Sequence, residues 1–243
     1  MKIRQPEHTV ACKVCQQTAT LFGMRDFNTT CNSEYLLSDI SIYYHQCSKC
    51  GLIFTVAFDD WGSEEYGRYI YNAEYIQYDP EFESIRPKAN LETLKQNFPA
   101  LKQWLVLDYG GGGGKLAALL KAEGVQAVGW DPFYGEGHRP GGCFDFICSF
   151  EVFEHTPAPI ETLLDLQLFL HPQGVIFFST LVHDGRTQLG INNPYIAPRN
   201  GHITIHTRES LKRLFARVGM SVIHYNDAFH IAWFPTNNSE SSL

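Results

Sequence analysis

A run of five glycines at positions 110–114 is the segment of this sequence that most restricts its chemistry. It follows the apolar residues 105–107 and Asp108, and a helix-forming stretch begins at Lys115. Strand, acid, glycine-rich turn and helix in this order present bare backbone and a helix N-terminus to a nucleotide-like cofactor. The order predicts a cofactor site at the carboxyl end of a strand.

A second acid, Asp131, ends the apolar segment 125–130, where a carboxylate can accept hydrogen bonds from both hydroxyls of a ribose. A nicotinamide-dependent enzyme would carry the same two marks. However, Asp108 lies just before the glycines, where it would repel the pyrophosphate of a dinucleotide. The acid therefore favours a cationic or zwitterionic cofactor.

Glu151, Glu154 and His155 follow the apolar segment 144–150, at the sheet edge where such proteins bind ligands. If they form one helical turn, their spacing brings two carboxylates and an imidazole to one face. Such a set suits Mg²⁺, Mn²⁺, Fe²⁺ or Zn²⁺ with open positions for substrate oxygens. The alternative is that Glu154 caps or pairs locally and His155 acts as a metal-free acid or base.

Four of the seven cysteines form two C-x-x-C pairs, Cys12 with Cys15 and Cys47 with Cys50. Four thiolates fill a structural zinc site and leave no position open for catalysis. The sequence carries no recognisable signal peptide, so we expect a reducing, cytoplasmic setting.

The composition is that of a globular protein, with 44% hydrophobic residues and a net charge of −7. No block of lysine or arginine stands out, which disfavours binding to bulk nucleic acid. No apolar stretch reaches the roughly 18 residues that a membrane-spanning helix needs. The composition therefore disfavours bulk nucleic acid and a membrane as partners, and a specific RNA end stays possible.

The elements that must position these residues fall into four segments. Residues 1–60 contain short strands and turns typical of a zinc ribbon, and residues 61–100 indicate a helical connector or cap. From residue 101 to 235 strands alternate with helices, which predicts a parallel α/β sheet. Residues 236–243 are a polar tail expected to be flexible. The expected strands are 105–108, 125–130, 144–150, 174–180 and 220–225, and the expected helices are 114–123, 158–170 and 208–218.

The segment 101–235 resembles class I S-adenosylmethionine-dependent methyltransferases. Their first motif, an acid, one residue and G-x-G-x-G, matches Asp108 and the glycines, and segments 144–155 and 170–176 match two later motifs. The resemblance implies a Rossmann-like sheet of seven strands, the last antiparallel. Residues 132–144 are too few for the usual third strand, which predicts a sheet shortened between strands two and four. The implied cofactor residues are Asp108, Gly110, Gly111, Gly112, Gly114 and Asp131, with adenine contacts assigned to Pro132, Phe133 or Ser149.

The E-x-x-E-H turn is similar to that of small-RNA 2′-O-methyltransferases and ubiquinone-pathway O-methyltransferases. The former carry a later histidine, for which His202 is the matching candidate and His206 the competitor. The likeness implies a second divalent metal, with Glu154, His155 and His202 as catalytic residues. The implied ligands of that metal are Glu151, Glu154, His155 and His202.

The cysteine pairs, with Gly51, Leu52 and Phe54 after the second pair, look like the zinc-binding domain of sugar methyltransferases, including deoxysugar C-methyltransferases. This likeness implies a carbohydrate-related acceptor. We therefore expect O-methylation of a hydroxyl on a sugar, a glycan-pathway compound or another diol- or catechol-like small molecule. Three alternatives stay open: C-methylation of a nucleotide-linked sugar, a non-catalytic zinc-ribbon adaptor, and 2′-O-methylation of an RNA end.

Overall fold

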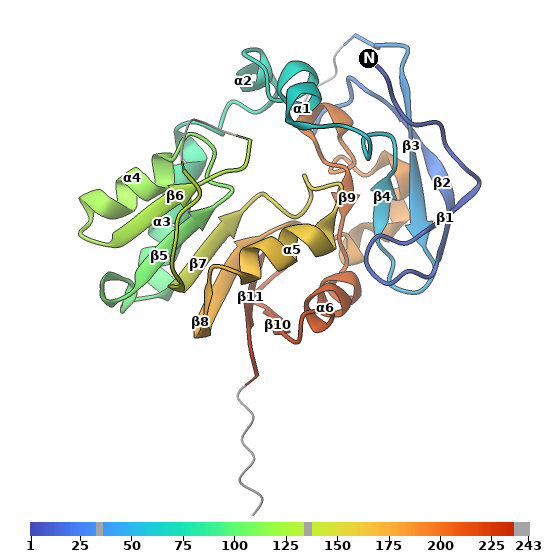
Figure 1. Cartoon of the computed structure of the whole chain (residues 1–243). Coiled ribbons are helices and arrows are strands. Elements are labelled where there is room, and N and C mark those ends of the chain that lie inside the picture. The colour runs from blue at the N-terminus through green and yellow to red at the C-terminus, as the bar shows by residue number, and fades with distance from the viewer. Residues whose placement is uncertain (33–35, 134–137, 236–243) are drawn as a thin grey trace, which may run out of the picture.

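The computed structural model of the chain describes residues 1–32, 36–133 and 138–235, without the side chains of residues 185–187. Two β-sheets lie beside each other, and helices cover the larger one (Figure 1). The predicted tail, 236–243, lies outside the described residues. None of the helices in the described ranges combines the length and the apolarity that a membrane crossing needs.

The larger sheet has the strand order β10-β11-β8-β7-β5-β6. The neighbours β6, β5, β7 and β8 are parallel, and β11 runs antiparallel between β8 and β10. This is the Rossmann-like arrangement expected from the alternation of strands and helices. In the described residues no strand or helix lies between β6 and β7, so the predicted shortening is confirmed and six strands replace seven. The strands are β5 (Leu105–Tyr109), β6 (Gln126–Trp130), β7 (Phe144–Phe150), β8 (Leu170–Ser179), β10 (Ser221–His224) and β11 (Phe229–Trp233).

Helices cover both faces of this sheet because its strands are apolar on both sides. α3 (Ile85–Asn97) and α4 (Lys115–Ala122) pack on one face, where Leu94 and Val106 share an apolar cluster. α5 (Pro159–Gln167) and α6 (Arg208–Ala216) pack on the other face, where Leu107 and Phe215 share another. Successive residues of a strand point to opposite faces, so Val106 and Leu107 enter different clusters.

The smaller sheet holds the predicted zinc-ribbon segment and is antiparallel. Its fifth strand, β9 (Thr204–Ile205), pairs with β4 and comes from the other end of the chain. The sheet therefore extends beyond the predicted boundary at residue 60, and it brings the ribbon next to His202. Its other strands are β1 (Thr9–Ala11), β2 (Thr18–Asp26), β3 (Ser41–Cys47) and β4 (Ile53–Thr55).

Residues 61–84, which we call the cap, join the two sheets and carry the short helices α1 (Ser63–Tyr69) and α2 (Tyr75–Tyr78). Tyr66 and Tyr75 are buried in an apolar cluster with Ile42 and Ile205 of the smaller sheet. The cap is thus fixed to the smaller sheet, whereas α3 belongs to the larger one. Three 3₁₀ helices complete the chain: η1 (Leu101–Gln103), η2 (Asp184–Asn192) and η3 (Pro198–Asn200).

Candidate active site

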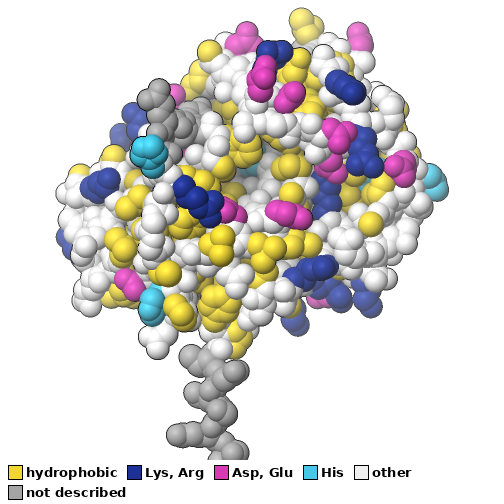
Figure 2. All heavy atoms as spheres, viewed as in Figure 1, with side chains coloured by type: hydrophobic (Ala, Val, Ile, Leu, Met, Phe, Trp, Pro, Cys, Tyr) yellow, Lys and Arg dark blue, Asp and Glu magenta, His cyan; other side chains and the backbone are white. Residues whose placement is uncertain are grey.

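A cavity of about 430 Å³ lies at the carboxyl ends of β5, β6 and β7. Gly110, Gly111, Gly112 and Asp131 line one side, and tyrosines of the cap line the other. Figure 2 shows this face hollowed between the cap and the larger sheet, with apolar side chains around the opening. Ligands of open α/β sheets bind at this edge, so the topology places the predicted cofactor residues where they can act.

The glycine turn follows β5 and cannot accommodate side chains at its first two positions. A Cβ on Gly110 would lie 2.4 Å from Val152 Cγ2, and a Cβ on Gly111 would lie 2.3 Å from Asp108 Oδ2. Gly110, Gly112 and Gly114 also adopt positive φ angles of 73°, 53° and 72°, which favour glycine. A glycine is thus required at position 111 because this residue packs closely on Asp108. The G-x-G-x-G motif does not reveal this requirement.

Asp108 lies buried under the turn with 2% of its surface exposed. Its Oδ2 atom has no hydrogen-bond partner within the described residues, and burial raises the pKa of this carboxyl to about 7. A buried carboxyl that has no cationic partner and lies beneath bare backbone suits the positive charge of a cofactor. The residues present therefore fit a cationic cofactor.

Asp131 directly follows β6 and lines the same cavity. Its Oδ2 accepts a hydrogen bond from the Gly112 N–H at 2.9 Å, and its Oδ1 accepts one from the Phe133 N–H at 2.8 Å. Pro132 and Phe133 also line the cavity, so both stay candidates for the adenine contact. Ser149, the third candidate for the adenine contact, is fully buried in β7 and is not among the residues that line the cavity. Gly114 caps the start of α4 rather than facing the cavity.

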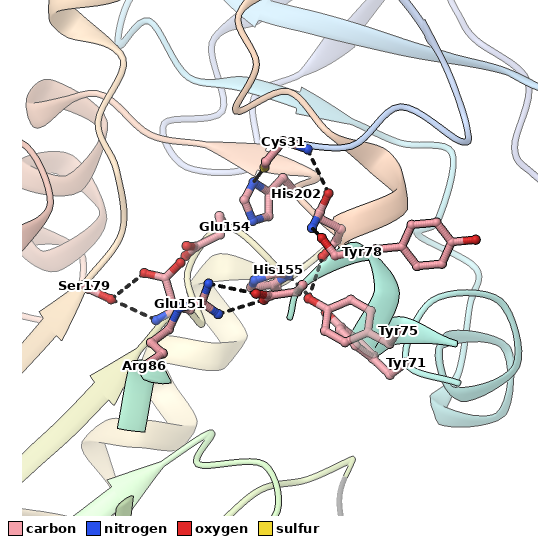
Figure 3. Close-up of polar contacts among 12 residues, drawn as sticks. Cys31, Tyr71, Tyr75, Tyr78, Arg86, Glu151, Glu154, His155, Ser179 and His202 are labelled. Atoms are coloured by element: carbon pink, nitrogen blue, oxygen red, sulfur yellow. Dashed lines mark hydrogen bonds and ion pairs between the residues drawn. The ribbon is translucent and has the colours of Figure 1, made fainter. Parts of the chain in front are cut away.

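Residues 151–155 form a tight turn after β7 and not the helical turn that we expected. Glu151 has a φ of 55°, and the His155 N–H donates to the Val152 carbonyl at 3.0 Å. The turn nevertheless brings Glu154 and His155 to His202, and the ligand atoms of these three residues lie within 4.8 Å of one another. Figure 3 shows the three side chains converging.

Each side chain of this group is held by a partner behind it. His202 Nδ1 lies 3.1 Å from the Tyr195 carbonyl, which only accepts, so Nδ1 carries the proton and Nε2 keeps its lone pair. The Tyr195 hydroxyl donates to Glu154 Oε1, and the Tyr71 hydroxyl lies 3.0 Å from His155 Nδ1. Such partners orient metal ligands in proteins. The sequence did not identify Tyr71 or Tyr195 because neither belongs to a motif.

Two of the predicted residues lie outside this group. The Glu151 carboxylate accepts a hydrogen bond from the Ser179 hydroxyl at 2.7 Å, which turns it toward β8, although Glu151 lines the cavity. His206, the competitor of His202, is buried elsewhere, with its ring nitrogens 3.1 Å from Ser210 Oγ and 3.3 Å from the Phe153 carbonyl. The structure thus brings together three of the four expected ligands.

The four cysteines of the two C-x-x-C pairs form a separate cluster in the smaller sheet. Cys12 Sγ and Cys50 Sγ lie 3.6 Å apart, and Cys15 Sγ lies 3.5 Å from Cys47 Sγ. These distances are too long for disulfides, whose sulfurs lie about 2.05 Å apart. They are close to the roughly 3.8 Å expected between thiolates around a tetrahedral zinc ion. The cluster therefore fits one zinc ion.

A comparison with protein families decides the class of this chain. Residues 74–225 match the family model of a methyltransferase domain. The chain belongs to this methyltransferase family. It is an S-adenosylmethionine-dependent enzyme, as the motif formed by Asp108 and the glycine turn predicted.

Several solved methyltransferases share part of the fold, and no curated protein matches the sequence. Magnesium protoporphyrin IX methyltransferase from Synechocystis PCC 6803 has 16% identity and a TM-score of 0.49, over 73% of this chain and 97% of that one. A methyltransferase of calicheamicin biosynthesis has 17% identity and a TM-score of 0.49, over 73% of this chain and 70% of that one. A protein described as a possible histamine N-methyltransferase, from Thermotoga maritima, has 16% identity and a TM-score of 0.47, over 70% and 98%.

The glycine turn of the methyltransferase allows a matched test. Gly111→Ala is expected to weaken binding of S-adenosylhomocysteine at least tenfold, because the added Cβ must displace Asp108 or the turn. Gly113→Ala is the control, since a Cβ there meets no atom within 4 Å. Calorimetry should leave the affinity of the control within about twofold of the unchanged protein. Equal affinities of the two variants would contradict the role of close packing at Gly111.

Proposed function

We propose that this methyltransferase methylates a hydroxyl oxygen of a small molecule that carries two adjacent hydroxyls, beside a divalent cation held by Glu154, His155 and His202. The observation that carries the proposal is the convergence of these three side chains at the end of the cavity. His155 lines the cavity, while Glu154 is fully buried behind it. An acceptor in the cavity would therefore reach the cation from the side of the group on which His155 lies.

The surroundings of Glu154 support a cation. Burial, and next the charge of Glu151, raise the pKa of Glu154 well above its ordinary value. The hydrogen-bond partner of its Oε1 is the neutral phenol of Tyr195, and two imidazoles adjoin it. A buried carboxylate is costly without a compensating positive charge. Two imidazoles in the set favour a transition-metal ion over Mg²⁺.

The chain's own residues account for the remaining steps. The glycine turn and Asp131 would hold the cofactor, and Glu151 and His155 would border the acceptor, because all of them line the same cavity. A bound cation would lower the pKa of the acceptor hydroxyl and stabilise its oxyanion. S-adenosylmethionine would supply the methyl group to this oxygen, with S-adenosylhomocysteine as the product that leaves. The hydroxyl proton passes to solvent through the open side of the cavity.

Metal content tests the proposal without knowledge of the acceptor. We expect two metal ions per chain, one on the cysteines and one on the Glu154 group. Glu154→Gln should lose the second ion and keep the first. Glu161→Gln, an acid that lines the same cavity outside the group, should keep both. Elemental analysis measures the difference. A single zinc in both variants and in the unchanged protein would leave His155 as a metal-free general base instead.

A further inference from the structure

We infer that the acceptor is an aromatic ring with adjacent hydroxyls and without negative charge, an inference that rests on the proposed O-methylation. We argue this inference from the residues of the cavity wall opposite the glycine turn and Asp131. The aromatic residues of that wall are Tyr66, Tyr71, Tyr75 and Phe82 of the cap.

The rings of the cap form a continuous apolar surface that ends at the reaction centre. Tyr71 and Tyr75 have ring centroids 5.3 Å apart at 66°, and Tyr75 and Phe82 have centroids 5.6 Å apart at 88°. Tyr71 touches His155 through its hydroxyl, as Figure 3 shows. A hydroxyl that reaches His155 therefore brings the rest of its molecule against these rings. Aromatic rings pack on such a surface in stacked or edge-to-face geometry.

The same wall is poorly suited to a sugar. The Tyr75 hydroxyl already donates to the Asn200 carbonyl at 3.2 Å, and the Tyr71 hydroxyl is engaged with His155 at 3.0 Å. A pyranose would place several hydroxyls against ring faces and edges that cannot satisfy them. The free energy lost by leaving polar groups without hydrogen bonds exceeds the free energy gained from the contact. The wall thus favours a catechol over a sugar diol.

The charges of the residues that line the cavity disfavour an anionic acceptor. Among the described residues that line the cavity, Arg86 is the single basic side chain of the lysine or arginine type. It donates two hydrogen bonds to Asp79, of 2.7 Å and 2.9 Å. Its charge is therefore compensated. Among the described lining residues, a phosphate or carboxylate would meet more acids than bases, and the proposed cation at Glu154, His155 and His202 would be its attractive contact. This argues against nucleotide-linked sugars and RNA ends. The lining acids are Asp79, Asp108, Asp131, Glu151, Glu161 and Asp165, of which Asp79 pairs with Arg86 and Asp165 with Arg139.

The pair formed by Asp79 and Arg86 provides a charge switch. Asp79 has 8% of its surface exposed and accepts both hydrogen bonds from Arg86, whose side chain lies near Glu151 in Figure 3. Asp79→Asn keeps the shape of the side chain and one hydrogen bond to Arg86 but removes the compensating charge. Arg86 then loses its main opposing charge, and Glu151 stays as the neighbouring acid. The variant should therefore accept anionic rings that the unchanged protein rejects.

Calorimetry with the protein saturated in S-adenosylhomocysteine tests the inference with four probes: catechol, 3,4-dihydroxyphenethylamine, 3,4-dihydroxybenzoate and UDP-glucose. We expect catechol and the amine to bind at least tenfold more tightly than the benzoate, and UDP-glucose not to bind. In Asp79→Asn the ratio of amine to benzoate affinity should fall about tenfold. Tyr75→Leu should weaken all ring probes about tenfold, whereas Tyr75→Phe should keep their affinity.

Tighter binding of the benzoate or of UDP-glucose by the unchanged protein would overturn the inference, and so would failure of every ring to bind while S-adenosylhomocysteine binds. An unchanged ratio in Asp79→Asn would also overturn it. These outcomes are separate from the metal test, because a protein that holds the second ion and methylates a sugar diol would refute only the aromatic acceptor. Loss of the second ion with intact ring binding would refute only the metal-assisted reaction.

Discussion

Cys47→Ser is expected to abolish cofactor binding together with zinc binding, although Cys47 lies in the smaller sheet and the cofactor residues lie in the larger one. Structural zinc sites contribute on the order of 10 kcal/mol to folding, as much as the whole stability of a typical domain at about 5–15 kcal/mol. If a zinc ion holds the four cysteines, loss of one ligand should unfold the smaller sheet. The contacts between the sheets should carry this loss into the larger one.

Those contacts run from the methyltransferase segment to both cysteine loops. Thr207, the N-cap of α6, donates to the Cys50 carbonyl at 2.5 Å, and Arg217 beyond its end donates to the Val14 carbonyl at 2.8 Å. β9 pairs with β4, and the Tyr44 hydroxyl of β3 donates to the His202 carbonyl at 2.9 Å. The ribbon is therefore part of the support of the reaction centre.

Cys143→Ser is the matched control, because Cys143 is exposed and lies outside the cluster. Elemental analysis should find zinc in the control and not in Cys47→Ser after dialysis against a mild chelator. Thermal unfolding should show a loss of the main transition only in Cys47→Ser, and S-adenosylhomocysteine should stabilise only the control. Retention of cofactor binding by a zinc-free Cys47→Ser protein would show that the ribbon folds and acts independently.

The sequence identified what depends on local order. Asp108, the glycines and Asp131 lie within one strand–turn–helix–strand unit, so their spacing along the chain sets their spacing in space. The four cysteines also meet as expected, since each pair lies on one short turn. The missing third strand followed from the short segment between Asp131 and Asp145, which leaves no room for a helix and a strand.

The rest depends on contacts between distant segments. Tyr195 reaches Glu154, and Tyr71 reaches His155, from parts of the chain that no periodicity relates to the turn at 151–155. The pairing of β9 with β4 joins two-residue and three-residue strands that are too short to predict from alternation. Glu151 was assigned to the metal from an assumed helix, but its positive φ and its bond to Ser179 direct it elsewhere.

Asp108→Asn is expected to stabilise the cofactor-free protein above pH 7 and to weaken cofactor binding. Burial raises the pKa of the Asp108 carboxyl to about 7 in the folded protein, against about 3.9 for an unfolded chain. Between these two values the folded state binds more protons than the unfolded state, so stability falls as pH rises through this window. The cost is absent below about pH 4 and complete above about pH 7. The shift corresponds to a few kcal/mol at most.

Thermal unfolding at pH 5.5 and pH 8 measures this effect. The midpoint of the unchanged protein should fall more over this range than that of Asp108→Asn, and the variant should be the more stable of the two at pH 8. Binding of S-adenosylmethionine should tighten roughly tenfold from pH 6 to pH 8 in the unchanged protein, because its positive charge favours the ionised acid. The variant should bind more weakly and without this trend.

Asp131→Asn is a control. It distinguishes the effect of burying the Asp108 charge from the effect of losing a contact with the cofactor. The Asp131 carboxylate already accepts two backbone N–H bonds, so its replacement should weaken binding without a gain in stability. Asp108→Asn could instead be less stable than the unchanged protein at pH 8 and keep the same dependence on pH. In that case the buried charge of Asp108 would not be what destabilises the cofactor-free protein. The acid of the motif would then serve the fold. With the expected result, the enzyme keeps an acid that weakens its empty state because the cofactor's positive charge compensates it.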